Sequence, residues 1–384
     1  MSGSGTRIGL IFSETGSYAG VCRSMRAAAD LAIDEINASG RLVLDSVTVD
    51  PGGCLGAYVT ATTDLLADPA ITHLVGCYTS SSRKEILPVL EKRDALLWYP
   101  SHYEGFETSE NVVYSGAAPN QHVIPLAKYL LGQSRHRGWL VGSNYVWAWE
   151  NNRILREALG IAGGTVMGER YVPVGETDLR DIARQIVCDR PDFVFTTLIG
   201  SSLFAFLDDL RDLAGAAGLD QSADIPVASC SLSEAELPLI GRAAAGHLSS
   251  SVYFSTVDTP ENQRFTEAWN ARFSDLGHAS ADAEATYVAV HLLARAIERA
   301  GSDGFEAVRE AARGIRFAAP QGEIEVDPMN LHCSLRPRIG ISRDDGTFDI
   351  AWESKQPVAP DPYLTWTQDS EFRIAAATHL KVVP

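Results

Sequence analysis

The beginning of the chain alternates short apolar runs with segments in which apolar residues recur at helical spacing. After a strand-like run at 7–12, apolar residues recur at intervals of three and four until Gly40, which predicts one face of a helix. These residues are Met25, Ala28, Ala29, Ala32, Ile33 and Ile36. Further apolar runs lie at 43–49, 73–75 and 95–99. The alternation predicts a parallel sheet covered by helices.

Three consecutive serines and an internal proline mark the helix between the last two of these runs. Ser80, Ser81 and Ser82 are residues that favour an N-cap, so we expect the helix to begin there. Pro88 lies inside the same helical pattern. Because proline has no N–H for the helical hydrogen bond, it predicts an irregular turn at this point.

The rest of the chain continues the alternation and then becomes rich in strands. The second block has predicted strands at 138–141, 165–171, 192–197 and 225–228, and predicted helices at 148–159, 179–187, 202–213 and 233–240. The third has a strand at 250–254, helices at 260–273, 281–300 and 304–313, and strands at 322–326, 338–342 and 347–352. No linker rich in Pro, Gly and Ser separates the blocks. We therefore predict an α/β fold with two doubly wound parallel-sheet lobes joined by short crossovers.

Size and charge exclude several classes of function. The chain has 384 residues, more than one hydrophobic core usually serves, and its net charge is -17 from 32 Lys and Arg against 49 Asp and Glu. This balance argues against direct nucleic-acid binding, which needs clustered cations. No run of roughly 18–20 apolar residues is present, so we expect no membrane insertion. The first residues lack the features of a secretory signal, which leaves a cytoplasmic protein or one whose leader was removed and which is periplasmic.

Cysteine and histidine spacing gives no sign of a metal or a cofactor. The six cysteines form no C-x-x-C pair, and we expect buried thiols, although a Cys54–Cys77 bridge in an oxidising compartment is left open. No two of the nine histidines have helical i, i+4 spacing. There is no G-x-S-x-G elbow and no phosphate-binding loop. Ser80 has only Arg83 and Lys84 as nearby titratable partners, so we interpret it as a helix cap that also touches a ligand. We expect no enzyme activity.

Hydroxyl groups gather where the predicted strands end. The six strand ends are 12–14, 76–80, 99–101, 142–145, 196–198 and 229–231. Ligands of open parallel sheets bind beyond the carboxyl ends of the strands. Ser, Thr and Tyr can both donate and accept a hydrogen bond, which suits a small, neutral, polar molecule. The pattern indicates a receptor lined with alcohols and phenols rather than with ionised groups.

Several motifs carry a resemblance to a known family. They include I-G-L-I-F-S-E-T-G at 8–16, D-P-G-G at 50–53, Y-E-G-F-E at 103–107, A-P-N-Q at 118–121 and P-D-P-Y at 360–363. The chain resembles the amide-sensing negative regulators of bacterial aliphatic amidase operons. These belong to the type I periplasmic binding proteins, and the chain is also similar to the Leu/Ile/Val receptors and to urea-binding transport proteins of that family.

The resemblance implies a division of the chain and a set of pocket residues. The expected N-terminal lobe comprises 1–120 and 256–330, and the C-terminal lobe comprises 121–255 and 331–384, with three crossovers between them. The positions that match the family's pocket are Tyr78, Ser80, Tyr99, Ser101 and Tyr145. His102 stands where the family has a proline, and Trp147 replaces a smaller aromatic residue.

Chemistry assigns a role to each pocket position. Ser80 is expected to bind a carbonyl oxygen through its hydroxyl and its backbone N–H at a helix N-terminus. Tyr145 is expected to reach across from the second lobe, while Tyr78 and Tyr99 wall the apolar end. Ser101 keeps the hydroxyl of the threonine that the family has there, and Thr197 and Ser231 are weaker candidates. An amino-acid ligand is disfavoured because no acid is evident for an ammonium group.

Two functions share this site. In the first, lobe closure on a short aliphatic amide controls amidase expression, because the protein sequesters an antiterminator partner and releases it. In the second, the closed form delivers urea or a short amide to the permease of an ABC transporter. The native ligand is left open, as is a homodimer.

Overall fold

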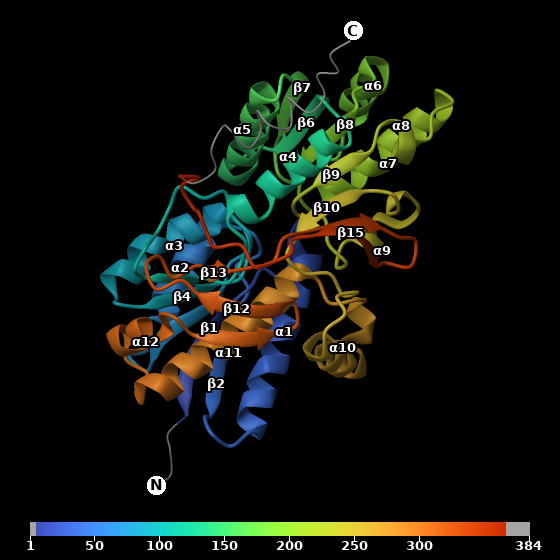
Figure 1. Ribbon diagram of the computed structural model, residues 1–384. Coiled ribbons are helices and arrows are strands. Elements are labelled where there is room, and N and C mark those ends of the chain that lie inside the picture. The colour runs from blue at the N-terminus through green and yellow to red at the C-terminus, as the bar shows by residue number, and fades with distance from the viewer. Residues whose placement is uncertain (1–4, 366–384) are drawn as a thin grey trace.

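The protein consists of two α/β lobes, and the computed structural model of the chain describes residues 5–365. Figure 1 shows the lobes one above the other, with β1 (Thr6–Ile11) in the lower lobe and β6 (Arg137–Ser143) in the upper one. The α/β class predicted from the alternation of strands and helices is confirmed.

A five-stranded parallel sheet forms the centre of the first lobe. Its strands are β1, β2 (Leu44–Val49), β3 (Ile71–Gly76), β4 (Leu96–Tyr99) and β5 (Val112–Tyr114), in the order β2-β1-β3-β4-β5. Side chains alternate between its two faces, so that Leu10 belongs to one core and Ile11 to the other. Both faces are therefore buried, as a doubly wound sheet requires.

Helices cover both faces of this sheet. The first core contains α1 (Ala19–Ala38), α10 (Pro260–Phe273), α11 (Ala281–Ala300) and α12 (Phe305–Ala312). The second core contains α2 (Leu55–Leu65) and α3 (Ser80–Lys92). A small antiparallel sheet of β11 (Arg316–Ala319), β12 (Gly322–Val326) and β13 (Cys333–Ser334) completes the lobe. A 3-10 turn, η3 (Ser274–Leu276), follows α10.

The second lobe has a seven-stranded sheet with a mixed edge. The order is β15-β14-β10-β9-β8-β6-β7, and the strands from β10 to β7 are parallel. Their bounds are β6 Arg137–Ser143, β7 Thr165–Val172, β8 Phe193–Thr197, β9 Val227–Ser229 and β10 Leu248–Ser251. The antiparallel edge strands are β14 (Arg338–Ser342) and β15 (Phe348–Glu353).

The helices of the second lobe also divide between two faces. One face carries α4 (Val123–Gly132) and α5 (Val146–Ile161). The other carries α6 (Arg180–Asp189), α7 (Ser201–Ala216) and α9 (Leu237–Ile240). The short elements α8, η1 and η2 span Gln221–Asp224, Pro119–Gln121 and Gly241–Ala243. None of the helices in the described range is long and apolar enough to cross a bilayer.

The chain passes between the two large sheets after β5, after β10 and after β13. The predicted lobe boundaries at 120/121 and 255/256 fall within the first two of these passages. The boundary at 330/331 precedes β13, which pairs with β12 of the first lobe. The division into lobes stays a prediction, and the sheets favour placing its third boundary between β13 and β14.

Three local expectations are wrong. Helix α3 runs without interruption through Pro88, which is exposed, so water can reach the carbonyl group that the proline leaves unpaired. Its cap is Thr79 rather than Ser80, because the Thr79 Oγ1 accepts from the Ser82 N–H at 3.2 Å. The predicted helix at 233–240 is reduced to α9, because Pro238 fits the first turn of a helix but not its interior.

The cysteines do not form the bridge that the sequence left open. All six are free thiols; Cys77 is buried while Cys54 is exposed. Cys188 is exposed as well, so the expectation of buried thiols is wrong for these two residues.

Replacing Pro88 with alanine tests the continuity of α3. Pro88→Ala should raise the free energy of unfolding by about 1–3 kcal/mol, because alanine restores a helical hydrogen bond and has a higher helix propensity. Urea unfolding followed by circular dichroism measures the change. Pro260→Ala is the matched control, because Pro260 lies in the first turn of α10, where its missing N–H costs nothing. An unfolding free energy equally unchanged in both variants would show that Pro88 is not in a continuous helix.

Candidate ligand-binding site

The carboxyl ends of the parallel strands in the two lobes meet at the interface between the lobes. Ile199, after β8, packs in the core of the first lobe, and Tyr145, after β6, contacts cores of both lobes. Gly200 follows with φ +58°, and a Cβ there would lie 2.0 Å from the Ser17 carbonyl oxygen. Only glycine permits this approach of the β8–α7 loop to the β1–α1 loop.

Ser80 lies at the lobe interface as the first residue of α3. It is 1% exposed, and its Oγ accepts from the Arg83 Nη1 at 3.4 Å. The backbone N–H groups of a first helical turn have no partner within the helix, and the helix dipole makes this end attractive to an oxygen. Ser80 therefore combines a hydroxyl with amide donors at one point.

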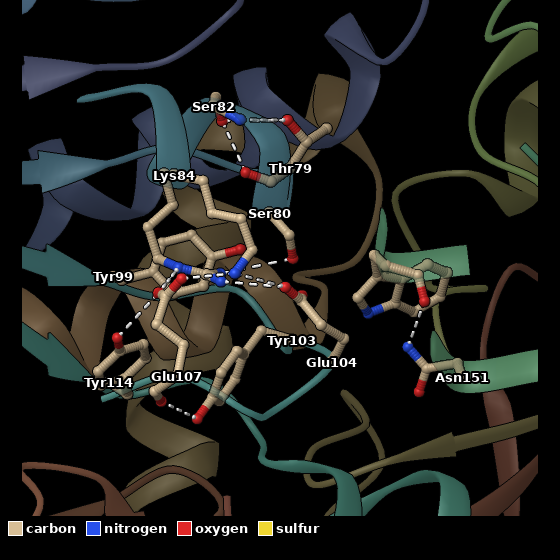
Figure 2. Close-up of polar contacts among 12 residues, drawn as sticks. Thr79, Ser80, Ser82, Lys84, Tyr99, Tyr103, Glu104, Glu107, Tyr114 and Asn151 are labelled. Atoms are coloured by element: carbon tan, nitrogen blue, oxygen red, sulfur yellow. Dashed lines mark hydrogen bonds and ion pairs between the residues drawn. The ribbon is translucent and has the colours of Figure 1, made fainter. Parts of the chain in front are cut away.

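A buried cluster of ionisable side chains, formed by Arg83, Lys84, Glu104 and Glu107, adjoins Ser80 (Figure 2). The Arg83 guanidinium is fully buried and donates through Nε to Glu107 Oε1 at 2.7 Å and through Nη2 to Glu104 Oε1 at 3.3 Å. It lies over the rings of Tyr99 and Tyr103, 4.7 Å and 4.8 Å from the ring centroids. The Lys84 Nζ pairs with the same two carboxylates.

The cluster holds Glu107 as a carboxylate. Burial alone would raise the pKa of Glu107, but Arg83 and Lys84 outweigh burial and lower this pKa to about 2. One of its oxygens accepts from Arg83 and Tyr114, and the other from Lys84. Glu107 thus has both oxygens engaged within the protein.

Glu104 differs from Glu107 in having one oxygen free. Its Oε1 pairs with Arg83 and Lys84, whereas its Oε2 is buried and has no hydrogen-bond partner among residues 5–365. The whole side chain belongs to a residue that is 1% exposed. A buried carboxylate oxygen accepts hydrogen bonds only, so Glu104 can receive an N–H or O–H from a bound molecule.

Tyr78, Tyr99 and Ser101 lie in the same lobe as Ser80 and are all buried. The Tyr99 hydroxyl donates to the Tyr78 carbonyl oxygen at 3.0 Å. The Ser101 Oγ donates to Asp282 Oδ1 at 3.0 Å. The Tyr78 ring lies 5.4 Å from the ring of Tyr18. The hydroxyls of Tyr99 and Ser101 therefore shape this part of the lobe through bonds to the protein itself.

Tyr145 and Trp147 reach the interface from the second lobe. Tyr145 is half-buried just before α5, and its ring stacks 6.2 Å from that of Trp147. Burial raises the pKa of Tyr145, and nearby Tyr99 and Glu104 of the first lobe raise it further. The indole Nε1 of Trp147 is buried without a partner in the described part of the chain. The Trp147 ring contacts His102 of the first lobe, with centroids 5.1 Å apart.

Thr197 and Ser231 have hydroxyls that are already bonded inside the second lobe. The Thr197 Oγ1 donates to Asn152 Oδ1 at 3.1 Å. The Ser231 Oγ lies 3.2 Å from the Ser229 Oγ, in hydrogen-bond contact. These contacts direct both hydroxyls to partners other than Ser80.

The expectation that the interface offers alcohols and phenols rather than acids is wrong. Three carboxyl groups are buried at it, those of Glu104, Glu236 and Asp282, and none of them was predicted from the sequence as a site residue. Glu104 belongs to the quoted Y-E-G-F-E motif, which was a usable signal. Glu236 and Asp282 had no local signal, since each becomes part of the site only through the packing of the lobes.

The polar side chains of the site are placed for hydrogen bonding. Within residues 5–365, no group of three or more His, Cys, Asp and Glu side chains could hold a metal ion. The site instead offers donors from Ser80, Tyr145 and Trp147 and an acceptor from Glu104.

Comparison with known proteins gives the same architecture. The sequence profile of the periplasmic binding protein domain matches residues 6–369. Leu/Ile/Val-binding protein homolog 6 of Brucella abortus is 25% identical over 293 residues, which are 74% of each chain. A limonene hydroxylase of Geobacillus stearothermophilus is 34% identical over 124 residues, so the match covers 32% of this chain and only 23% of that protein.

Solved structures share the fold across both lobes. An ABC-transporter solute binding protein from Rhodopseudomonas palustris, in complex with p-hydroxybenzoic acid, has a TM-score of 0.84 and 21% identity, covering 95% of this chain and 100% of that one. The branched-chain amino acid transporter substrate binding protein LivJ from Streptococcus pneumoniae, in complex with isoleucine, has a TM-score of 0.79 and 18% identity, covering 91% and 99%. The fold predicted from the resemblance is confirmed, and the chain belongs to the periplasmic binding protein domain family.

Proposed function

We propose that this protein captures a short, uncharged amide or urea between its two lobes. The observation that carries the proposal is the buried Glu104 Oε2, which has no partner in the described chain and belongs to a residue that shares the Arg83 guanidinium with Ser80. The two residues are neighbours because one guanidinium, that of Arg83, bonds to both. A carboxamide has a carbonyl acceptor and N–H donors, so it matches Ser80 and Glu104 at once.

The charge balance of the cluster favours an uncharged ligand. Arg83 and Lys84 carry two positive charges, and Glu104 and Glu107 carry two negative charges. The cluster is neutral as a whole, so a bound ion would leave an uncompensated charge in a buried place. The amide can complete the hydrogen bonding of Glu104 without changing this balance.

Closure of the lobes supplies the remaining contacts. In our proposal Tyr145 and Trp147 donate to the ligand from the second lobe, while Tyr78, Tyr99 and Ser101 form the wall of the first lobe. A ligand that bonds to both lobes stabilises the closed arrangement relative to the open one. Thr197 and Ser231 are left out, because their hydroxyls already bond to Asn152 and Ser229. The function is binding rather than catalysis.

The relatives favour transport over sensing. The Brucella relative is named a Leu/Ile/Val-binding protein homolog, and the Rhodopseudomonas protein of the same fold serves an ABC transporter. We therefore propose a substrate-binding component that delivers its ligand to a permease. The sensor function, in which an antiterminator is sequestered, rests on the motif resemblance alone.

Removing single hydroxyls tests the proposed contacts. Ser80→Ala and Tyr145→Phe should each weaken binding of acetamide and urea by about 1–3 kcal/mol, because a buried polar group of the ligand loses its partner. Isothermal titration calorimetry measures the dissociation constants. Ser81→Ala and Tyr129→Phe are matched controls outside the site and should bind as the wild type does. Equal affinity in all four variants would remove Ser80 and Tyr145 from the site.

Exchanging Glu104 for glutamine tests the acceptor. Glu104→Gln should lower the affinity for acetamide at least about tenfold and improve binding of acetate, which has no N–H to give to a carboxylate. Glu107→Gln removes the same charge from the same cluster but leaves Glu104 Oε2 in place, so it should retain the preference for acetamide. If both variants lose acetamide equally, Glu104 acts only through its charge. Thermal unfolding of each variant without ligand, followed by circular dichroism, separates affinity from stability.

Cell fractionation distinguishes the two cellular roles. A transport component must lie outside the cytoplasmic membrane, so immunoblots of its source bacterium should find the protein in the extracytoplasmic fraction. A cytoplasmic enzyme serves as the marker of leakage. Recovery with that marker alone would contradict the transport role and favour the sensor.

A further inference from the structure

A second buried carboxyl group enters the lobe interface beside the proposed site. Glu236 precedes α9 in the second lobe and is 2% exposed. Its Oε2 has no hydrogen-bond partner within the described chain. Glu236 lines a groove of about 570 Å³ between the lobes, together with Tyr18 of the first lobe and Leu239 of the second.

Asp282 of the first lobe faces the same region. It lies in the first turn of α11, is 3% exposed and accepts the hydroxyl of Ser101. The His102 Nδ1 lies 3.6 Å from it. Asp282 and Glu236 both act on the Tyr78 phenol, whose pKa is raised by burial first and by these two acids next. Closure therefore brings two carboxyl groups from opposite lobes to one tyrosine.

No arginine or lysine neutralises this pair. Among residues 5–365, neither Glu236 nor Asp282 forms an ion pair with either residue type. The contrast with Glu104 is sharp, since Glu104 lies between Arg83 and Lys84. Two buried carboxylates that no Arg or Lys neutralises repel one another and are both poorly solvated, so the carboxylate that also lacks a histidine neighbour, Glu236, is more stable with a proton.

We infer that Glu236 links lobe closure to proton uptake, entering the closed interface as a neutral carboxylic acid that shares the region with Asp282. The inference rests on the proposed function, in which the lobes close on a ligand. When the lobes are apart, Glu236 leaves Asp282 and meets water, and the proton dissociates. Ligand binding then takes up one proton.

The titration of Glu236 agrees with this geometry. Burial first and Asp282 next raise its pKa, backbone N–H groups of Ser233 and Gly200 act in the opposite direction, and the resulting pKa is about 8. The pKa of the closed form is thus above the ordinary carboxyl value of the open form. Low pH therefore favours the closed form over the open form. This preference weakens as the pH rises toward about 8 and no longer changes above that value.

The other titratable groups near Glu236 come from every element packed around it. From the first lobe they are Tyr18 before α1, Cys22 and Arg23 in α1, Tyr78 after β3, His102 after β4 and Asp275 in η3. From the second lobe they are Tyr145 before α5 and Glu234 two residues before Glu236. The phenols and the Cys22 thiol have a raised pKa and stay neutral below pH 9. Arg23 donates to the Glu14 carbonyl oxygen. Burial raises the pKa of Glu234 as well, to about 7, but one Glu234 oxygen accepts the Ser255 N–H and the residue does not line the groove. We therefore assign the proton of closure to Glu236, which does line it.

Calorimetry on the full chain with acetamide tests the inference. The affinity of the wild type should fall up to about tenfold per pH unit between pH 6 and 8 and then level off, with close to one proton taken up. Titrations in buffers of different ionisation enthalpy count that proton. Glu236→Gln keeps the shape and removes the charge, so its affinity should stay constant over this range at the low-pH value of the wild type.

A matched control separates this effect from burial of an acid as such. Burial also raises the pKa of Glu284, to about 7, but Glu284 bonds to Gln321 inside the first lobe and does not cross the interface. Glu284→Gln should therefore leave the pH profile of binding unchanged. A wild-type affinity that does not depend on pH, or a Glu236→Gln profile that falls as the wild type does, would overturn the inference.

Small-angle scattering of the ligand-free chain makes the two proposals separable. The wild type should become less compact between pH 6 and 9, and Glu236→Gln should not. If acetamide gives no binding heat while this difference persists, the ligand is wrong and the proton linkage stands. If acetamide binds and neither measurement depends on Glu236, the ligand stands and the linkage fails.

Discussion

The candidate site depends on one buried guanidinium. Arg83 has no exposed surface, and burying its charge would cost several kcal/mol without partners. The ring of Tyr99 at the end of β4, and Tyr103, Glu104 and Glu107 in the loop that follows, provide those partners. The same guanidinium bonds to Ser80 at the start of α3. Arg83 thus fixes the position of a helix N-terminus relative to an acceptor carboxylate, which is the geometry that an amide needs.

The strands and helices that could be predicted are those long enough to show a periodic pattern of apolar residues. Strands such as β1 and helices such as α11 have enough apolar residues in register to be recognised locally. By contrast, β5, β11 and β13 have two to four residues each, too few to show an alternation. Their places are set by pairing with distant strands, which local spacing does not report.

The site was predictable to the extent that its chemistry lies at strand ends. Ser80 and Tyr145 follow from that rule, because β3 and β6 end beside them. Thr197 satisfies the same rule, yet its hydroxyl turns to Asn152 on α5. The position of a residue at a strand end therefore does not determine which face its side chain takes. Glu236 and Asp282 meet only when two separate lobes pack, so no spacing in the sequence could indicate them.

The acids at the interface are of two kinds, which differ in whether a basic side chain lies beside them. Glu104 is paired with Arg83 and Lys84, and in the proposed function its free oxygen is the acceptor that selects N–H groups. Glu236 has no such compensation in the described chain, so its charge is tolerated only where water reaches it. In the proposed function the first kind of acid selects the solute, and in the inferred proton linkage the second kind makes closure depend on pH. A single interface can in this way select a neutral ligand with one carboxyl group while coupling its capture to protons with another.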